Sequence, residues 1–372
     1  MLIKYFRNIR FFIFLISALT LNTSAHAFNK PPAVDLVKGD FSIMVLGSGG
    51  PAALGDANGG SGRASSSYLI FIDGKPKILM DAGGGAFKNL AESGSNIKDL
   101  DIVLLTHLHL DHTGDLPSII KTLYFHNSIY NINNQTFPPG RIKPFRVFGP
   151  ATNGMAFPPS LGADPSTTQY SSTSTYVDKH FDLNSGTERY LNIFTRATSA
   201  GIFKYEATDS SPQWTSYNPR VILDENGLVI TAVGVNHGPV PNVSYRIEYK
   251  GKSIVYSGDT SSRKVDPQGN PLENGGNMIS ISENADILIY DAGLGTDIPP
   301  SPAFEFFYKL HTTPSRMGEV AAAANVKMLM LSHITLQSEN EIPNMKDLIR
   351  NQGFVGRIEA TQDLEVYNLL AR

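Results

Sequence analysis

The residues best suited to metal chemistry lie together in one short segment of this 372-residue chain. Positions 106–112 have the sequence Thr-His-Leu-His-Leu-Asp-His, which contains His107, His109, Asp111 and His112. Neutral imidazole nitrogens and carboxylate oxygens are common ligands of zinc and similar divalent cations. The chain has nine histidines, and three of them lie in this segment. The spacing indicates a metal-binding cluster, and a polar strand end with solvated histidines is the alternative.

Three more residues of the same kind follow other apolar runs. The cluster itself comes after residues 102–105, a run typical of a buried strand. Later apolar runs are followed by His237, Asp259 and His333. A lone histidine after a strand is usually structural, but four coincident cases predict that these strand ends meet at one site. Because the chain has no cysteine, such a site must use His, Asp and Glu, and disulfides are excluded.

The N-terminal segment has the pattern of a secretory signal peptide. Three basic residues precede a short apolar stretch at 11–21, and Ala25-His26-Ala27 is a small-x-small cleavage site. We therefore expect cleavage after Ala27, a periplasmic or secreted protein, and no membrane span after signal removal. An uncleaved anchor is the alternative, although the apolar stretch is shorter than the roughly 20 residues that a span needs.

The rest of the chain, residues 28–372, is predicted to be one domain with an irregular insertion. The chain is 41% hydrophobic and 17% charged, and its net charge of −3 gives no overall basic field for nucleic acid. Residues 127–220 are rich in Pro, Asn, Ser and Thr. We expect them to form a loop-rich insertion, either a functionless excursion or a lid or partner-binding arm. Strands clustered on both sides of it indicate two sheets stacked between helical layers.

Taken together, the motifs resemble the metallo-β-lactamase superfamily. The resemblance implies an α/β fold, a four-layer αββα sandwich, with a binuclear metal centre at one edge of the sheets. By this match, His107, His109 and His237 hold one metal. Asp111, His112 and His333 hold the other, and Asp259 bridges the two. The donors suit two divalent ions per chain, zinc first and manganese or iron as alternatives; no other cofactor is expected.

Several stretches resemble one branch of the superfamily, the branch of RNase Z, arylsulfatase and cyclic-nucleotide phosphodiesterase. They are the glycine loop 47–51 with Arg63 and Ser66-Ser67, the segments 241–247 and 256–260, and His311-Thr312-Thr313. In that branch an extra histidine acts on the scissile phosphate or the leaving group. The resemblance therefore implies that His311 is a transition-state stabiliser or general acid, with a surface histidine as the alternative.

Two aspartates are expected to support the site. Asp291 stands where RNase Z usually has the glutamate that partners the extra histidine, so it could partner His311 only with a shorter reach. Asp81 matches a family position just after a strand, and we expect it to orient a ligand histidine rather than only cap a turn. The catalytic residues that we expect are thus Asp111, His311 and Asp291.

The resemblance implies an exported binuclear metal-dependent hydrolase that cleaves phosphodiester bonds by attack of a metal-bridging hydroxide. We expect a small-molecule ester as substrate and no stable nucleic-acid partner, since residues 127–220 contain few basic side chains and do not resemble an arm that grips tRNA. A homodimer would be in keeping with the branch. Arylsulfatase, lactonase or β-lactamase-type chemistry on the same metal centre is the first alternative. A non-catalytic periplasmic metal- or partner-binding protein is the second.

Overall fold

The computed structural model describes residues 31–51, 62–123, 144–155, 169–191 and 204–371. The predicted signal peptide lies outside these residues. The described residues from 32 onward belong to one compact unit. Among the described residues, no helix has the length and apolar character needed to cross a bilayer.

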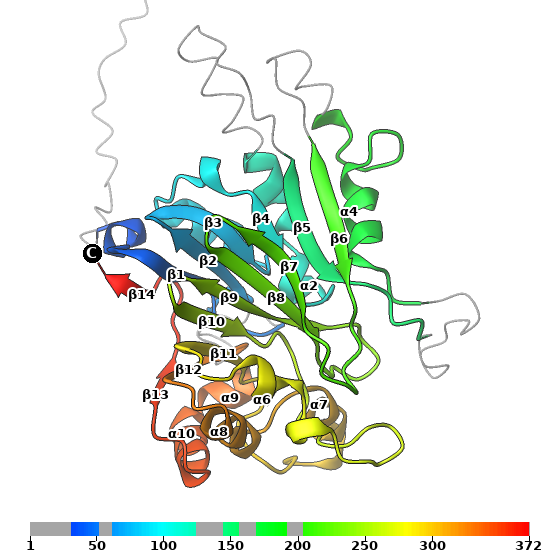
Figure 1. Cartoon of the computed structure of the whole chain (residues 1–372), viewed down its shortest axis with the longest axis vertical. Coiled ribbons are helices and arrows are strands. Elements are labelled where there is room, and N and C mark those ends of the chain that lie inside the picture. Colours follow the sequence, from blue (N-terminus) through cyan, green and yellow to red (C-terminus); the bar gives the residue numbers. More distant parts are fainter. Residues whose placement is uncertain (1–30, 52–61, 124–143, 156–168, 192–203, 372) are drawn as a thin grey trace, which may run out of the picture. The chain divides into compact units, whose positions relative to one another are not determined.

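Two seven-stranded sheets form the framework of this unit (Figure 1). The first sheet has the order β14-β1-β2-β3-β4-β5-β6, with β1 Gly39–Gly47, β2 Ser67–Ile72, β3 Lys75–Met80, β4 Ile102–Leu104, β5 Phe145–Pro150, β6 Tyr205–Ser210 and β14 Val366–Ala371. The second has the order β13-β12-β11-β10-β9-β8-β7, with β7 Arg220–Glu225, β8 Leu228–Gly234, β9 Val243–Tyr249, β10 Lys252–Tyr256, β11 Ile287–Asp291, β12 Met328–Ser332 and β13 Arg357–Ala360. In each sheet, antiparallel neighbours on one side give way to parallel neighbours on the other, such as β3-β4-β5 and β10-β11-β12.

Alternation along the strands builds three apolar layers. In β1, Ile43 and Val45 point into the core between the two sheets, whereas Met44 and Leu46 point to the outer face of the first sheet. This period of two is that of a strand buried on both faces. Each fully buried aliphatic side chain stabilises the fold by about 1.5–3 kcal/mol, so both faces of each sheet need a cover.

Helices supply that cover on both outer faces. The first sheet packs against α1 Ala86–Glu92, the helical residues 116–123 and α4 Thr173–Phe181. The second packs against α6 Asn277–Ile281, α8 Pro314–Ala323 and α10 Ile342–Asn351. Shorter helices are η1 Ala33–Leu36, η3 Ile97–Asp99, α2 Leu110–Thr113, η5 Glu273–Gly275, η6 Pro302–Phe304, α7 Glu305–Leu310 and α9 Leu336–Glu339. The order helix, sheet, sheet, helix confirms the predicted four-layer αββα sandwich.

The segment at 127–220 contains regular structure that its composition did not predict. Its described parts include β5, β6 and α4, and the two strands extend the parallel half of the first sheet. Strand β6 lies at the edge of that sheet, and the positions of its sequence Tyr-Glu-Ala-Thr-Asp-Ser are half-buried or exposed, apart from the buried Ser210 at its end. An edge strand buries too little to show a strong apolar pattern. Residues 124–143, 156–168 and 192–203 lie outside the described structure, so a lid or arm stays a prediction.

Candidate metal centre

The predicted ligands lie where strands of both sheets end. His107 and His109 occupy the loop after β4, and α2 carries Asp111 and His112. The two sheets are joined directly at this edge, because the backbone N–H of Val243 donates to the carbonyl of Thr106 across 3.0 Å. The loops after β8, β10 and β12 then bring their own ligand-type residues to the same place, which are His237, Asp259 and His333.

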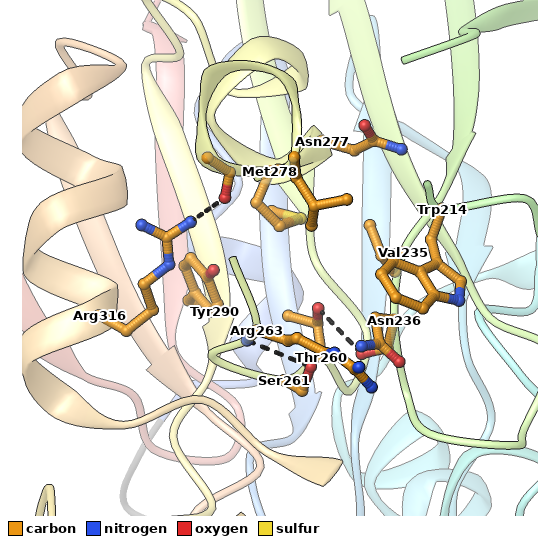
Figure 2. A pocket seen from close by; sticks show the side chains of 13 residues that line it. Trp214, Val235, Asn236, Thr260, Ser261, Arg263, Asn277, Met278, Tyr290 and Arg316 are labelled. Atoms are coloured by element: carbon orange, nitrogen blue, oxygen red, sulfur yellow. Dashed lines mark hydrogen bonds between the residues drawn. The ribbon is translucent and has the colours of Figure 1, made fainter. Parts of the chain in front are cut away.

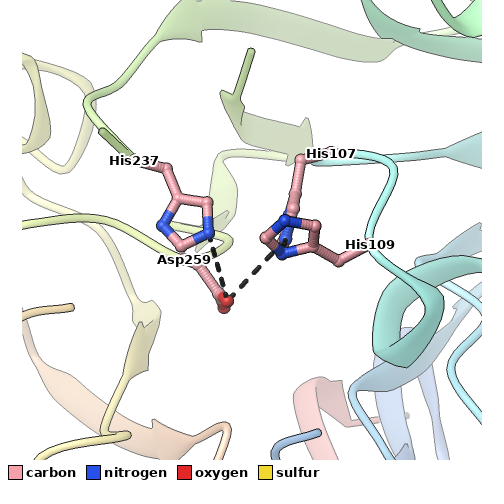
Figure 3. Close-up of side chains that lie close together, drawn as sticks. All are labelled: His107, His109, His237 and Asp259. Atoms are coloured by element: carbon pink, nitrogen blue, oxygen red, sulfur yellow. Dashed lines mark hydrogen bonds and ion pairs between the residues drawn. The ribbon is translucent and has the colours of Figure 1, made fainter. Parts of the chain in front are cut away.

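One group of four side chains has the size of a single metal site (Figure 3). It contains His107, His109, His237 and Asp259, whose ligand atoms all lie within 4.8 Å of one another. Oδ2 of Asp259 is 3.7 Å from Nε2 of His107 and 3.8 Å from Nε2 of His237. Ligands about 2.0–2.2 Å from a tetrahedral zinc ion are themselves about 3.4 Å apart, so the group needs little contraction to hold one.

A second group shares Asp259 with the first. Its other members are Asp111, His112 and His333, and the four ligand atoms again lie within 4.8 Å of one another. Nε2 of His333 is 3.1 Å from Oδ2 of Asp111 and 3.3 Å from Oδ2 of Asp259. Nε2 of His112 is 3.3 Å from Oδ1 of Asp259. All seven predicted ligands are thus brought together, and Asp259 lies between the two groups.

Unpaired buried atoms support a metal at this place. Nε2 of His112, Nε2 of His237 and Oδ1 of Asp259 are buried and have no hydrogen-bond partner. A buried polar atom left unpaired costs about 1–3 kcal/mol, and nearly all such atoms in proteins are paired. Divalent cations bound between the two groups would supply the missing partners, so the donor set fits the metals that the family implies.

Hydrogen bonds on the far side of two imidazoles direct a lone pair toward the centre. Nδ1 of His237 donates to the carbonyl of Leu310 across 3.0 Å, which leaves Nε2 as the unprotonated nitrogen. Nδ1 of His112 donates to Oδ2 of Asp81 across 2.7 Å, so Nε2 faces the centre and is the nitrogen that a metal would bind once the ring has lost its second proton. Asp81 is itself held by the backbone N–H of Thr106 and the hydroxyl of Tyr256, each at 2.8 Å. Asp81 therefore lies where a residue that orients His112 should lie.

Burial and charge separate the histidines into two protonation classes. Burial lowers the pKa of His107 and His109, and it lowers the pKa of His237 to about 4, so the first group is neutral and able to bind metal at neutral pH. Burial also opposes the charged form of His112, but the Asp259 and Asp81 carboxylates outweigh it and raise that pKa. Burial raises the pKa of Asp259, yet the surrounding imidazoles, His333 foremost, outweigh it and hold that pKa well below its usual range.

The predicted partner of His311 reaches it. Oδ2 of Asp291 accepts hydrogen bonds from Nδ1 of His311 at 2.9 Å and from the backbone N–H of Thr260 at 3.1 Å. The His311 ring stacks on the His333 ring, with centroids 5.2 Å apart and planes 20° apart. Burial disfavours the imidazolium of His311, but Asp291 outweighs burial and raises its pKa to about 9. His311 is thus buried beside the second group rather than on the surface.

Several supporting residues had not been predicted. They are Thr106, Tyr256, Gly258 and the carbonyl of Leu310. Gly258 has φ +58°, and a Cβ at this position would lie 2.6 Å from Cβ of Thr106. Glycine therefore allows the loop after β10 to approach the loop after β4, which brings Asp259 to the histidines. Gly258, directly before Asp259, is a signal that the sequence contains. The carbonyl of Leu310 has no such signal, because every residue has a backbone carbonyl.

A recess lies next to these loops but does not include the predicted ligands (Figure 2). Asn236 and Tyr290 line it, and each precedes a site residue in the sequence. Arg316 also lines it, and its guanidinium is held by Glu319 at 2.9 Å and by the carbonyl of Gly275. Because the guanidinium of Arg316 is already bound by groups of the protein, we interpret the recess as part of the packing around the strand ends.

Comparison with known proteins agrees with the geometry. Residues 60–303 match the family model described as the metallo-beta-lactamase superfamily. A protein named Ribonuclease Z from Mycolicibacterium paratuberculosis is 26% identical over 328 residues, which are 87% of this chain and 96% of that protein. Another with this name, from Pseudomonas putida, is 23% identical over 82% of this chain and 92% of its own length.

Solved structures show the same fold. The short form of human tRNase Z superposes with a TM-score of 0.56 at 18% identity, covering 88% of this chain and 99% of that one. The metallo-β-lactamase fold protein YhfI from Bacillus subtilis superposes with a TM-score of 0.54 at 18% identity, over 88% of this chain and 98% of its own. The chain therefore belongs to the metallo-β-lactamase superfamily, and it is a metal-dependent hydrolase. The names of its relatives are consistent with the branch that the sequence motifs indicated.

Proposed function

We propose that this protein is an exported binuclear hydrolase of phosphodiester bonds. The observation that carries the proposal is the arrangement of two four-residue groups that share Asp259 and lie beside the His311–Asp291 pair. Two bound divalent cations would provide a nucleophile from water at neutral pH and neutralise charge that develops on the phosphate. The alternatives on the same metal centre differ in the bond that is attacked, which is a sulfate ester, a lactone ester or a β-lactam amide.

The side chains of the protein have separate tasks in this proposal. His107, His109 and His237 offer neutral imidazoles, and Asp81 fixes the ring of His112. Among the carboxylates of the two groups, Asp111 is the more accessible, with a side chain 12% exposed against 3% for Asp259. Asp111 is therefore the carboxylate of the two groups that is more open to an incoming substrate, and its catalytic part stays a prediction.

His311 is the proposed general acid. Its Nδ1 is held by Asp291, so its Nε2 proton is the one available to a leaving oxygen. The raised pKa, about 9, keeps the ring protonated at neutral pH, although nearby bound cations would lower it. The Asp291 carboxylate keeps the ring oriented after the proton has been given up.

The names of the relatives weigh against our expectation of a small-molecule substrate. Proteins called Ribonuclease Z act on RNA, and several of the most similar relatives have that name. RNA is therefore the second candidate substrate for this chain, and the phosphodiester bond is common to both candidates. The net charge of −3 favours the smaller one.

The test is an assay of residues 28–372 with bis(p-nitrophenyl) phosphate and zinc or manganese. We expect turnover that His109→Ala abolishes and that His180→Ala preserves. His180 lies on α4 and takes no part in either four-residue group, so it controls for loss of a histidine. Parallel reactions contain p-nitrophenyl sulfate, a lactone, a cephalosporin and an RNA oligonucleotide.

Each outcome separates the proposals. Turnover of the sulfate, lactone or cephalosporin without any phosphodiester would overturn the phosphodiesterase proposal. Two metals per chain with no turnover of any substrate would favour the non-catalytic alternative. Export is tested separately, by recovering the tagged full-length chain from the periplasm or medium with Phe28 at its N-terminus. Light scattering tests the predicted homodimer.

A further inference from the structure

A cluster of one half-buried and two exposed aromatic side chains lies next to the proposed proton donor along the chain. It comprises Phe304, Phe306 and Phe307 of η6 and α7, and we call it the aromatic cluster. Ring centroids are 6.2 Å apart for Phe304 and Phe307 and 6.3 Å apart for Phe306 and Phe307. Phe306 is 61% exposed and Phe307 45% exposed. Neighbouring apolar side chains left in water commonly mark a binding surface.

Three contacts connect α7, which carries Phe306 and Phe307, to the metal centre. The backbone N–H of His311 donates to the carbonyl of Phe307 across 2.9 Å, so the two residues are one helical turn, about 6 Å, apart along the chain axis. The carbonyl of Leu310, the last residue of α7, accepts from Nδ1 of His237. Leu310 also packs on the loop of His237, because a Cβ on Gly238 would lie 2.5 Å from Cδ2 of Leu310.

The charge of the segment favours an uncharged group. Within residues 301–310, all of which the structure describes, the charged side chains are Glu305 and Lys309, which cancel. A nucleic-acid strand is bound through an excess of positive groups that neutralise its phosphates. An uncharged aromatic ring instead gains from packing against the faces and edges of phenyl rings.

We infer that the aromatic cluster receives the aromatic ring of the substrate's leaving group. The inference rests on the proposed function, in which His311 protonates the leaving oxygen. An oxygen from water forms a bond to phosphorus as the bond between phosphorus and the leaving oxygen breaks. The electron pair of the broken bond stays on the leaving oxygen, and the Nε2 proton of His311 completes the departing phenol. Whatever is attached to the oxygen must lie on the His311 side, where α7 ends. The substrate class is thus a phosphodiester of a phenol.

Two phosphodiesters with different leaving groups test this inference. The metal-loaded mature chain is assayed with methyl p-nitrophenyl phosphate and with methyl 2,2,2-trifluoroethyl phosphate. For each, the ratio of kcat/KM between the native protein and a variant is taken, so that the intrinsic reactivity of the leaving group cancels. Phe307→Ala should lower kcat/KM about tenfold for the aryl ester, the size expected for one ring contact, and less than about twofold for the alkyl ester.

Matched variants separate aromatic packing from general damage. Phe307→Trp should keep the activity toward the aryl ester, because it retains a ring at this position. Val355→Ala removes a side chain that is 95% exposed between α10 and β13, and it should change neither ratio. Equal losses for both esters, or no loss for either, would overturn the inference even if the native protein is a good phosphodiesterase.

Binding without turnover provides an independent measurement. Methyl phenylphosphonate has a phosphorus–carbon bond in place of the aryl ester bond, and calorimetry compares it with methyl methylphosphonate. The native protein should bind the phenyl compound about tenfold more tightly, and Phe307→Ala should remove that preference. If no ester is hydrolysed but this preference is found, the proposed function fails, and the aromatic cluster binds an aromatic ring that is not a leaving group.

Two further results would assign the cluster to a different occupant. If the Phe306→Ala and Phe307→Ala variants lose cleavage of an RNA oligonucleotide but not of the aryl ester, the cluster receives a nucleobase and the inference is wrong. If they change the molecular mass in solution and leave both kcat/KM ratios equal, the cluster is a contact between two copies of the chain, and the inference is wrong.

Discussion

Replacing Asp81 by asparagine tests how one hydrogen bond prepares a metal ligand. Oδ2 of Asp81 accepts from Nδ1 of His112 at 2.7 Å and from the hydroxyls of Thr106 and Tyr256 at 2.8 Å each. The hydroxyls can rotate, but an amide NH2 in this place cannot accept the imidazole proton. Flipping the amide would set the NH2 against the backbone N–H of Thr106, which now donates to Oδ1 at 2.8 Å.

The neutral imidazole of His112 then keeps its proton on Nε2, and the lone pair that faces the centre is lost. Loss of a partner of this kind weakens metal binding about 10–100-fold, so we expect the second metal to bind about 1.4–2.7 kcal/mol more weakly. The first metal should change much less, because His107 is connected to Asp81 only through the Thr106 hydroxyl.

Calorimetric titration with zinc measures the two affinities, and nitrogen NMR of the imidazoles reports which ring nitrogen of His112 is protonated. Asp347→Asn, at an exposed position on α10, is the matched control and should leave both affinities unchanged. The reasoning is refuted if both metals weaken equally. It is also refuted if the second metal weakens while His112 remains protonated on Nδ1.

Three further predictions concern stability. Gly258→Ala should lower the free energy of unfolding by about 1–3 kcal/mol more than Gly227→Ala. Both glycines have positive φ, but only at Gly258 would the new Cβ meet a neighbour, Thr106. Equal losses in denaturant titrations would contradict the close approach of Gly258 to Thr106. Asp286→Asn should lower the free energy of unfolding by about 1 kcal/mol at neutral pH. Burial raises the pKa of Asp286, but hydrogen bonds from Lys327, the Ser253 N–H and Lys252 outweigh burial, so the pKa in the folded protein is lowered. The stabilisation by Asp286 is therefore present above the unfolded pKa of about 3.9 and is lost as the pH falls through the folded pKa. A cost that persists in strong acid would be contrary evidence. Zinc at about 100 times its Kd should raise the free energy of unfolding by about 2.7 kcal/mol per site and raise Tm. Chelation should lower Tm again, by more in the native chain than in His109→Ala. An equal response of the two proteins in thermal melts would argue against the first metal group.

The sequence predicted which candidate ligands the structure brings together, because their signal is local. Each follows a short apolar strand, and the observed β4, β10 and β12 end close to where the apolar runs end. Side chains that meet across a sheet edge, such as Asp81 and Tyr256, are 175 residues apart and no local pattern joins them. The carbonyl of Leu310 has no side-chain signature at all.

The fold was predicted less completely at its edges. The interior strands, such as β1 and β11, are buried along nearly their whole length and have continuous apolar sequences. Edge strands β6, β7 and β13 have mixed or exposed positions, and their residues alone do not distinguish them from loops. Their pairing depends on neighbours that the linear pattern does not show.

The metal centre takes its parts from both halves of the chain, since the segment at 107–112 follows a strand of the first sheet and His237, Asp259 and His333 follow strands of the second. Neither sheet alone has a complete set of donors, so a high-affinity site can form only late in folding, after the two sheets have docked. A bound cation would then connect the two sheets through its ligands. Metal binding should mainly slow the separation of the sheets during unfolding. It should therefore lengthen the lifetime of the native state more than it speeds folding.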